Sequence, residues 1–398
     1  MLASLTMTIL LMMMMATSAA LASDAVVLRG QARALLVWKD SLDNQSQHAL
    51  RSWGNMSAPC NWRGITCGTS VHWHRRRPVI TSISLGDMQL GGTLESLNFS
   101  ALRTLTRLDL LSNQLVGHIP CEIGHMKHLV ALDLSSNNLS SNIPSSIGGL
   151  TKLTSLYLYG NQLYGQIPRE PGYLLNLEDL QLSTNTLSGS IPRNLRNLTK
   201  LTVLNLWGNK LSGLIPQELG YLGNLQYLDL SEKILSGSIP NSLGNLTKLT
   251  TLYLFQNQFS GHIPRELGYL ENLEEVALRD NTLTGSIPNS IRNLTKLTGL
   301  NLFSNQLSGH IHRELGYLEK LERLDLSNNT LTGSISNSIG NLTKLTYLHL
   351  ENNQLSGHIP RELGYLVNLD YLYLSYNTLT GSIPEDLGNL TKLRYLYL

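Results

Sequence analysis

One hydrophobic period governs this chain: an apolar residue, nearly always leucine, recurs every 24 residues without an insertion. Successive side chains of a strand alternate between its faces, so the spacing LxxLxL predicts a short strand whose leucines face one way. No single repeat can bury these leucines alone, and neighbouring repeats must therefore stack into a continuous parallel sheet. The aligned positions are Leu108, Leu132, Leu156, Leu180, Leu204, Leu228, Leu252, Val276, Leu300, Leu324, Leu348, Leu372 and Leu396.

An asparagine follows most of these strands. The positions are 113, 137, 161, 185, 209, 257, 281, 305, 329, 353 and 377. A buried asparagine amide can satisfy backbone donors and acceptors where the chain turns off the strand, so the stacked copies predict an asparagine ladder. Lys233 takes this place in one repeat. Lysine has donors but no acceptor, and we expect one link to be lost at a cost of about 1 kcal/mol.

A Gly-x-Ile-Pro step follows the asparagine. Glycine permits a turn, and Ile-Pro favours an extended segment after it. His312 and Ser336 replace the proline in two repeats, and Pro171 replaces an apolar residue. We expect these departures to be local.

The N-terminal segment predicts export. Residues 1–23 contain a short apolar run and the small-x-small pattern Ala20-Leu21-Ala22, which is typical of a secretory signal peptide; an uncleaved membrane anchor is the alternative. In an exported protein, Cys60 and Cys67 are close enough in sequence to form a disulfide. Cys121 is then an unpaired thiol or takes part in an intermolecular bridge.

These residues resemble a known family. The 24-residue unit with LSGxIP, together with Trp38, Trp53 and the segment CNWRGITC at residues 60–67, is similar to ectodomains of plant leucine-rich-repeat receptor-like kinases, including their N-terminal cap. The resemblance covers residues 31–398. It implies a leucine-rich-repeat α/β solenoid, a right-handed superhelix or horseshoe with a parallel sheet on its concave side. About 13 repeats of 24 residues would follow one irregular first repeat.

The expected organisation is a signal peptide at 1–23, a cap with a basic loop at 24–78, and repeats at 79–398. The chain stops at Leu398 inside a repeat, and solenoids need polar terminal caps. We therefore expect an ectodomain truncated before its membrane span and kinase, attached to a membrane only through that missing C-terminal span. A secreted inhibitor of pathogen wall-degrading enzymes, similar to polygalacturonase inhibitors, is the alternative, and a non-functional remnant is a third hypothesis.

A second period of 48 residues overlies the first. It places N-glycosylation sequons before alternate strands, which implies surface glycans in an exported protein. We expect Asn138, a further sequon, to be a poor acceptor because it lies in a tight turn beside Asn137. The predicted sites with this period are Asn197, Asn245, Asn293, Asn341 and Asn389, and the predicted sites outside it are Asn44, Asn55 and Asn98.

Aromatic residues recur on the predicted concave face of alternate repeats. Exposed aromatics on a sheet are favoured contact residues, so we expect a linear peptide to lie along this face. The alternative is that duplication copied the rings and that they only pack on their neighbours. The predicted contact residues are Tyr157, Tyr159, Trp207, Tyr253, Phe255, Arg279, Phe303, His349 and Tyr373.

Other function classes receive little support. The net charge is +2, which does not favour a nucleic-acid partner. The chain has no phosphate-binding glycine loop, no kinase triplets and no G-x-S-x-G nucleophile motif, so we expect no catalytic residues and no cofactor. His72 and His74 beside Arg75–Arg77 lack further metal ligands and predict a solvated loop. The expected partner is a peptide or protein, with a co-receptor ectodomain as a further candidate.

Overall fold

The computed structural model describes residues 27–54, 58–72 and 75–398, so the expected signal peptide and Asn55 lie outside the described residues. The chain divides into two compact units, at residues 1–164 and 165–398. The first unit begins with a helix at residues 27–41, followed by α2 (Asn44–Ala49) and the 3-10 helix η1 (Pro59–Asn61). Trp38 and Trp53 are fully buried between these elements, with ring centroids 6.2 Å apart.

A disulfide and a hairpin complete this N-terminal part. Cys60 and Cys67 are bonded, as the sequence predicted. Strand β1 (Ile65–His72) pairs antiparallel with β2 (Arg75–Ser84), in a register that extends to the pair His72 and Arg75. The prediction of a loop was therefore wrong for residues 75–77. The hairpin continues beyond the part of β2 that joins the repeat sheet, so residues 75–77 are paired with β1.

The first unit then adopts the repeat pattern. Its strands form two parallel sheets, with 3-10 helices on the other side of each repeat. One sheet continues from β2 through β4 (Arg107–Asp109), β6 (Ala131–Asp133) and β8 (Ser155–Tyr157). The other contains β3 (Gly91–Gly92), β5 (Gln114–Gly117), β7 (Asn138–Ser141) and β9 (Gln162–Gln166), which crosses the boundary between the units. The helices are η2 (Phe99–Ala101), η3 (Cys121–His125) and η4 (Ser145–Gly149).

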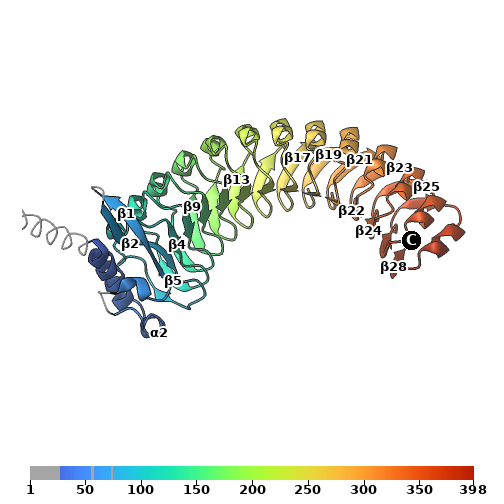
Figure 1. Ribbon diagram of the computed structural model, residues 1–398. Helices are drawn as coiled ribbons and strands as arrows, with labels where there is room; N and C mark the ends of the chain where they lie inside the picture. The colour runs from blue at the N-terminus through green and yellow to red at the C-terminus, as the bar shows by residue number, and fades with distance from the viewer. Residues whose placement is uncertain (1–26, 55–57, 73–74) are drawn as a thin grey trace, which may run out of the picture. The chain divides into compact units, whose positions relative to one another are not determined.

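The second unit repeats this arrangement from end to end, with the 3-10 helices along its upper edge and the strands below them (Figure 1). The first sheet contains β10 (Asp179–Gln181), β12 (Val203–Asn205), β14 (Tyr227–Asp229), β16 (Thr251–Tyr253), β18 (Glu275–Ala277), β20 (Gly299–Asn301), β22 (Arg323–Asp325), β24 (Tyr347–His349), β26 (Tyr371–Tyr373) and β28 (Tyr395–Tyr397). The second contains β11 (Thr186–Gly189), β13 (Lys210–Gly213), β15 (Ile234–Gly237), β17 (Gln258–His262), β19 (Thr282–Gly285), β21 (Gln306–His310), β23 (Thr330–Ser334), β25 (Gln354–His358) and β27 (Thr378–Thr380). The helices are η5 (Glu170–Tyr173), η6 (Arg193–Asn197), η7 (Gln217–Tyr221), η8 (Asn241–Asn245), η9 (Arg265–Tyr269), η10 (Asn289–Asn293), η11 (Arg313–Tyr317), η12 (Asn337–Asn341), η13 (Arg361–Tyr365) and η14 (Glu385–Asn389).

The helical part of each repeat is 3-10 and not α. Only about one turn separates the Ile-Pro step from the next leucine, which is too short to stabilise an α-helix. A glycine before the last residue of most of these helices allows close stacking. A Cβ on Gly268 would lie 2.5 Å from the carbonyl oxygen of Ser290 in the next repeat. His312 and Ser336 stand directly before η11 and η12 with extended backbones, so their replacement of proline is local, as expected.

The asparagine ladder is present in both units. In a representative link, Asn209 donates from Nδ2 to the carbonyl oxygens of Leu182 and Leu206 at 2.9 Å, and its Oδ1 accepts from the N–H of Leu187 at 3.0 Å. The anchor leucines behind the ladder are buried. Burial of each such side chain contributes about 1.5–3 kcal/mol, and the ladder satisfies the polar groups beside them.

Lys233 replaces only half of a ladder link. It is 7% exposed, and its Nζ donates to the carbonyl oxygens of Leu206 and Ser231. The donor function of asparagine is therefore retained, which the sequence had not predicted. The acceptor function is lost, because lysine offers nothing to the N–H of Leu211, the counterpart of Leu187. Burial lowers the pKa of Lys233 to about 7, although Asp229 and Glu232 oppose this shift.

The turn after the ladder requires a left-handed backbone. Glycine occupies this position in nearly every repeat, for example Gly261 with φ of 75°. Ser141 takes the same place with φ of 72°. A residue with a Cβ is strained there, so this repeat is less stable locally than its neighbours.

Candidate functional site

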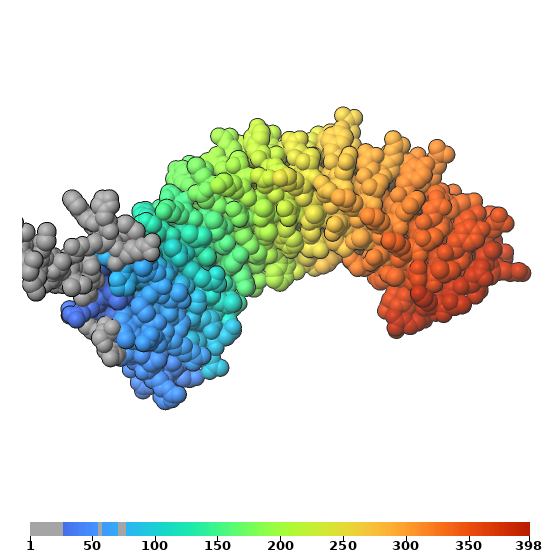
Figure 2. Space-filling view, viewed as in Figure 1, coloured from blue at the N-terminus to red at the C-terminus, as the bar shows by residue number. Residues whose placement is uncertain are grey.

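The outward-facing side chains of the first sheet in the second unit form the candidate site. They stand one residue before, one after and three after each anchor leucine, because side chains alternate along a strand. We call this surface, from β10 to β28, the strand face. Its predicted contact residues are half-buried, except His349, which is 7% exposed. They are therefore less exposed than the sequence predicted. Successive repeats follow one another closely in this unit (Figure 2).

One group of predicted residues lies together on β16 and after β18. The ring centroids of Tyr253 and Phe255 are 6.0 Å apart, with the rings edge to face. The guanidinium carbon of Arg279 lies 4.2 Å from the centroid of Phe255, and its Nη1 forms an ion pair with Asp280 at 2.7 Å. Arg279 thus forms a cation–π contact with the ring of Phe255 within the chain itself.

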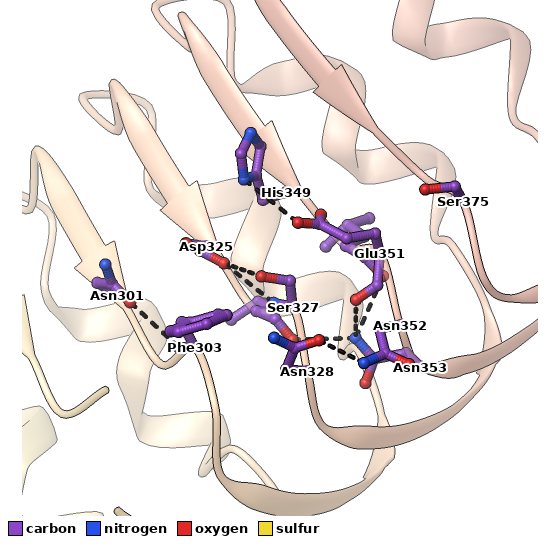
Figure 3. Close-up of polar contacts among 12 residues, drawn as sticks. Asn301, Phe303, Asp325, Ser327, Asn328, His349, Glu351, Asn352, Asn353 and Ser375 are labelled. Atoms are coloured by element: carbon purple, nitrogen blue, oxygen red, sulfur yellow. Dashed lines mark hydrogen bonds and ion pairs between the residues drawn. The ribbon is translucent and has the colours of Figure 1, made fainter. Parts of the chain in front are cut away.

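A second group surrounds His349. Its imidazole stacks between Tyr347 and Tyr373, with centroid distances of 3.7 and 4.0 Å. Burial lowers the pKa of His349 to about 4, so the ring is neutral near neutral pH. Its Nδ1 lies 3.5 Å from Oε1 of Glu351, whose own pKa is raised by burial (Figure 3).

Between the two groups the strand face is hollowed. Small residues, Ala277 and Gly299, line a depression of about 360 Å³. Tyr253 and Phe255 stand at one end, and Tyr347 at the other. Aromatic walls with a few polar groups are typical of ligand-binding depressions.

The polar groups of this depression come from β18, β20 and β22. Arg323 reaches across Gly299 and pairs with Glu275 at 2.5 Å. Asp325 lies opposite Asn301 in the sheet, and its Oδ1 accepts hydrogen bonds from the backbone N–H of Ser327 at 3.1 Å and from its hydroxyl at 2.5 Å (Figure 3). Burial raises the pKa of Asp325.

The remaining predicted residues are placed separately. Tyr157 and Tyr159 belong to the first unit, where both are half-buried. Trp207 and Phe303 belong to the second unit. The backbone N–H of Trp207 donates to Oδ1 of Asn205, and that of Phe303 donates to Oδ1 of Asn301, each at 3.1 Å. The structure therefore groups Tyr253 with Phe255 and Arg279, and His349 with Tyr373.

Several residues of the depression were absent from the sequence prediction. Tyr347, Arg323 and Glu275 each stand one residue before an anchor. The two-residue period of a strand places this position on the same face as the residue after the anchor. The two-residue period was therefore the sequence signal that could have identified Tyr347, Arg323 and Glu275. Asp325 stands one residue after its anchor, a position at which the sequence prediction included only tyrosines and His349.

The sequons lie on the opposite side of the repeats. Asn197, Asn245, Asn293, Asn341 and Asn389 are each exposed and each end a 3-10 helix. Exposed tyrosines occupy the same position in the intervening repeats, at Tyr173, Tyr221, Tyr269, Tyr317 and Tyr365. We call this surface the helix face. The separation of sequons from the strand face agrees with the predicted arrangement, although glycan attachment itself remains a prediction.

The other sequons are also accessible where described. Asn44 and Asn98 are exposed. Asn138 is exposed too and begins β7, so its predicted position in a tight turn was wrong. The left-handed residue of that turn is Ser136, two positions earlier.

Three further features concern the described residues only. Cys121 is a free, exposed cysteine at the start of η3. In the described part of the chain, no group of three or more His, Cys, Asp or Glu side chains could hold a metal ion. No helix within the same residues combines the length and apolar character needed to cross a bilayer.

Family models match most of the chain. A model described as leucine-rich repeat region matches residues 83–213 and 193–315, and a leucine rich repeat N-terminal domain matches residues 28–68. Two further leucine-rich-repeat models match residues 319–358 and 368–390. The N-terminal match covers the helices and disulfide of the cap.

Several known proteins with similar sequences or structures are plant receptors. The chain is 43% identical over 100 residues to the LRR receptor-like serine/threonine-protein kinase RGI3 of Arabidopsis thaliana, which covers 25% of this chain and 8% of that protein. It is similar to the structure titled PEPR1-AtPEP1, at 33% identity and a TM-score of 0.80, over 92% of this chain and 54% of that one. The plant peptide hormone receptor RGFR1 in complex with RGF2 matches at 34% identity and a TM-score of 0.68, over 79% of this chain and 58% of that one.

The chain thus spans little more than half the length of these solved receptors and a small part of the receptor kinase. The cap, the asparagine ladder and the paired sheets occur together with family matches over more than half of its residues. This chain belongs to the leucine-rich-repeat proteins, and its relatives are the ectodomains of plant receptor-like kinases.

Proposed function

We propose that this chain is the extracellular recognition part of a plant cell-surface receptor and that it binds a linear peptide along the strand face. The depression between Phe255 and Tyr347, with aromatic residues at both ends, is the observation that carries this proposal. The solved relatives titled PEPR1-AtPEP1 and RGFR1 in complex with RGF2 support it. The alternative of an enzyme inhibitor is not better supported by these relatives.

The spacing of the strand face suits an extended ligand. Neighbouring strands lie about 4.8 Å apart, so equivalent residues in alternate repeats are roughly 9.6 Å apart. An extended peptide advances about 3.3 Å per residue. Every third ligand residue therefore meets a side chain such as Trp207, Phe255 or Phe303.

The proposed activity is recognition and not catalysis. The matching family models all describe leucine-rich repeats or their cap. The perturbed groups on the strand face, such as His349 and Glu351, are explained by burial among aromatic rings. A role in binding accounts for the family matches, which are all to repeats or their cap, and for the buried groups on the strand face.

A peptide-selection experiment tests the proposal. A phage-displayed library of random dodecapeptides is selected on the purified chain, and the affinities of synthetic peptides are measured by calorimetry. Trp207→Ala and Phe255→Ala should each weaken binding about tenfold or more, because buried aromatic residues dominate such interfaces. Tyr221→Ala on the helix face is the matched control and should leave affinity unchanged. Equal affinity for all variants would reject the strand face as the binding surface.

A further inference from the structure

The two ends of the depression differ in their charge balance. At the end formed by Phe255, Arg279 lies over the aromatic ring and pairs with Asp280. At the other end, Tyr347 stacks one face of its ring on His349 and also lines the depression. Asp325 also lines this end, one strand away and opposite His349 in the sheet. Among the described residues, no ion pair includes Asp325.

Two of the three equivalent aspartates elsewhere in the chain have a second partner, whereas Asp133, like Asp325, is bonded among the described residues only to the serine two residues later. Asp109 follows the same Arg-Leu sequence as Asp325, and Arg107 donates to its Oδ2 at 2.8 Å. Asp229 receives a hydrogen bond from the hydroxyl of Tyr227 at 3.2 Å, again on Oδ2. At Asp325 the corresponding side chain is Arg323, which turns away to Glu275.

The neighbouring side chains explain this difference. Gly299 leaves the space in which the carboxylate of Glu275 meets Arg323, two strands away. Burial raises the pKa of Asp325 although Arg279 acts in the opposite direction, so a half-buried carboxylate without an ion-paired cation is costly here. A cation at Asp325 would remove that cost, and the ring of Tyr347 would attract the same cation through its π face. Aromatic rings with one desolvated carboxylate form a site for a positively charged group and not for an apolar one.

We propose that the end of the depression at Asp325 and Tyr347 binds an arginine or lysine side chain of the peptide ligand. This inference rests on the proposed function and names the chemistry of one ligand position. The guanidinium or ammonium group donates to Asp325 and lies against Tyr347. The ligand thereby supplies the partner that Arg107 provides to Asp109.

The same selected dodecapeptides test this inference. We expect the binders to share an arginine or lysine. Replacing that arginine by citrulline, or that lysine by norleucine, should weaken binding about tenfold or more. Asp325→Asn should weaken binding to a similar degree. It keeps an oxygen for Ser327, and circular dichroism confirms that the variant is folded.

Asp133→Asn is the matched control, because Asp133 accepts hydrogen bonds from Ser135 as Asp325 does from Ser327 but belongs to the first unit, outside the strand face. It should leave affinity unchanged. If peptides bind in a manner sensitive to Phe255→Ala but indifferent to citrulline and to Asp325→Asn, the cation site is wrong while the proposed function stands. If no library peptide binds the strand face, both are overturned.

Discussion

Replacing Lys233 by asparagine should stabilise the chain strongly, and by an amount that depends on pH. Each unit of pKa corresponds to about 1.4 kcal/mol, so the fall from 10.5 to about 7 destabilises the folded state by about 5 kcal/mol where lysine is protonated in both states. Asparagine also restores the acceptor for Leu211, which adds about 1 kcal/mol. We expect Lys233→Asn to raise the free energy of unfolding by about 5–6 kcal/mol near pH 6.

The sign of the pH dependence follows from proton binding. The pKa of Lys233 is lowered on folding, so between about pH 7 and pH 10.5 the unfolded chain binds more protons than the folded chain. The stability of the natural chain therefore rises with pH across this window, and its full penalty is present below it. The advantage of Lys233→Asn should shrink to about 1 kcal/mol toward pH 10.

Urea unfolding followed by tryptophan fluorescence, at about pH 6 and about pH 9.5, measures this difference. Lys233→Met is the control, since it removes the titration but provides neither the donors nor the acceptor of the ladder. It should flatten the same pH dependence and fall short of the asparagine variant by about 2–3 kcal/mol. Parallel pH profiles for the natural chain and Lys233→Asn would refute the reasoning about the buried ammonium group.

Three further predictions concern separate parts of the molecule. Ser141→Gly should stabilise the first unit by about 1 kcal/mol in urea unfolding, because its left-handed backbone suits glycine; no gain would remove strain as the explanation. Alanine at both Cys60 and Cys67 should cost about 2–3 kcal/mol in the same assay, and an unchanged midpoint would show that the cap does not depend on its disulfide. Asn245→Gln should remove one glycan by mass spectrometry from protein secreted by plant cells and leave peptide affinity unchanged; an unaltered mass would contradict occupancy of that site.

The repeat framework was predictable because its causes are local and repeated. Leu252 and its counterparts must be buried, and Asn257 must satisfy the backbone beside them, wherever the unit occurs. The retained donor function of Lys233 was not predictable from the pattern. It depends on a long side chain reaching the carbonyl oxygen of Leu206 in the preceding repeat, which only coordinates reveal.

The candidate site was predictable in part. The aromatic residues after each anchor could be read from the strand period, which places Tyr253 and Phe255 on the same side of their strand. The pairing of Arg323 with Glu275 could not be read from the sequence. Arg-Leu-Asp occurs at both Arg107 and Arg323, yet the first arginine pairs within its strand and the second reaches across Gly299 to another strand. The outcome depends on the size of a side chain in a neighbouring repeat.

Residues that lie 48 positions apart are constant at one position of the helix face and differ at one position of the strand face. On the helix face the duplicated position is tyrosine at Tyr173 and in each later copy through Tyr365. On the strand face the equivalent copies differ, reading Tyr159, Trp207, Phe255, Phe303 and Glu351. These side chains lie outside the leucine core and the ladder, so exchanging them carries little penalty for folding. A two-repeat unit of this kind can be copied whole and then given a new specificity one side chain at a time.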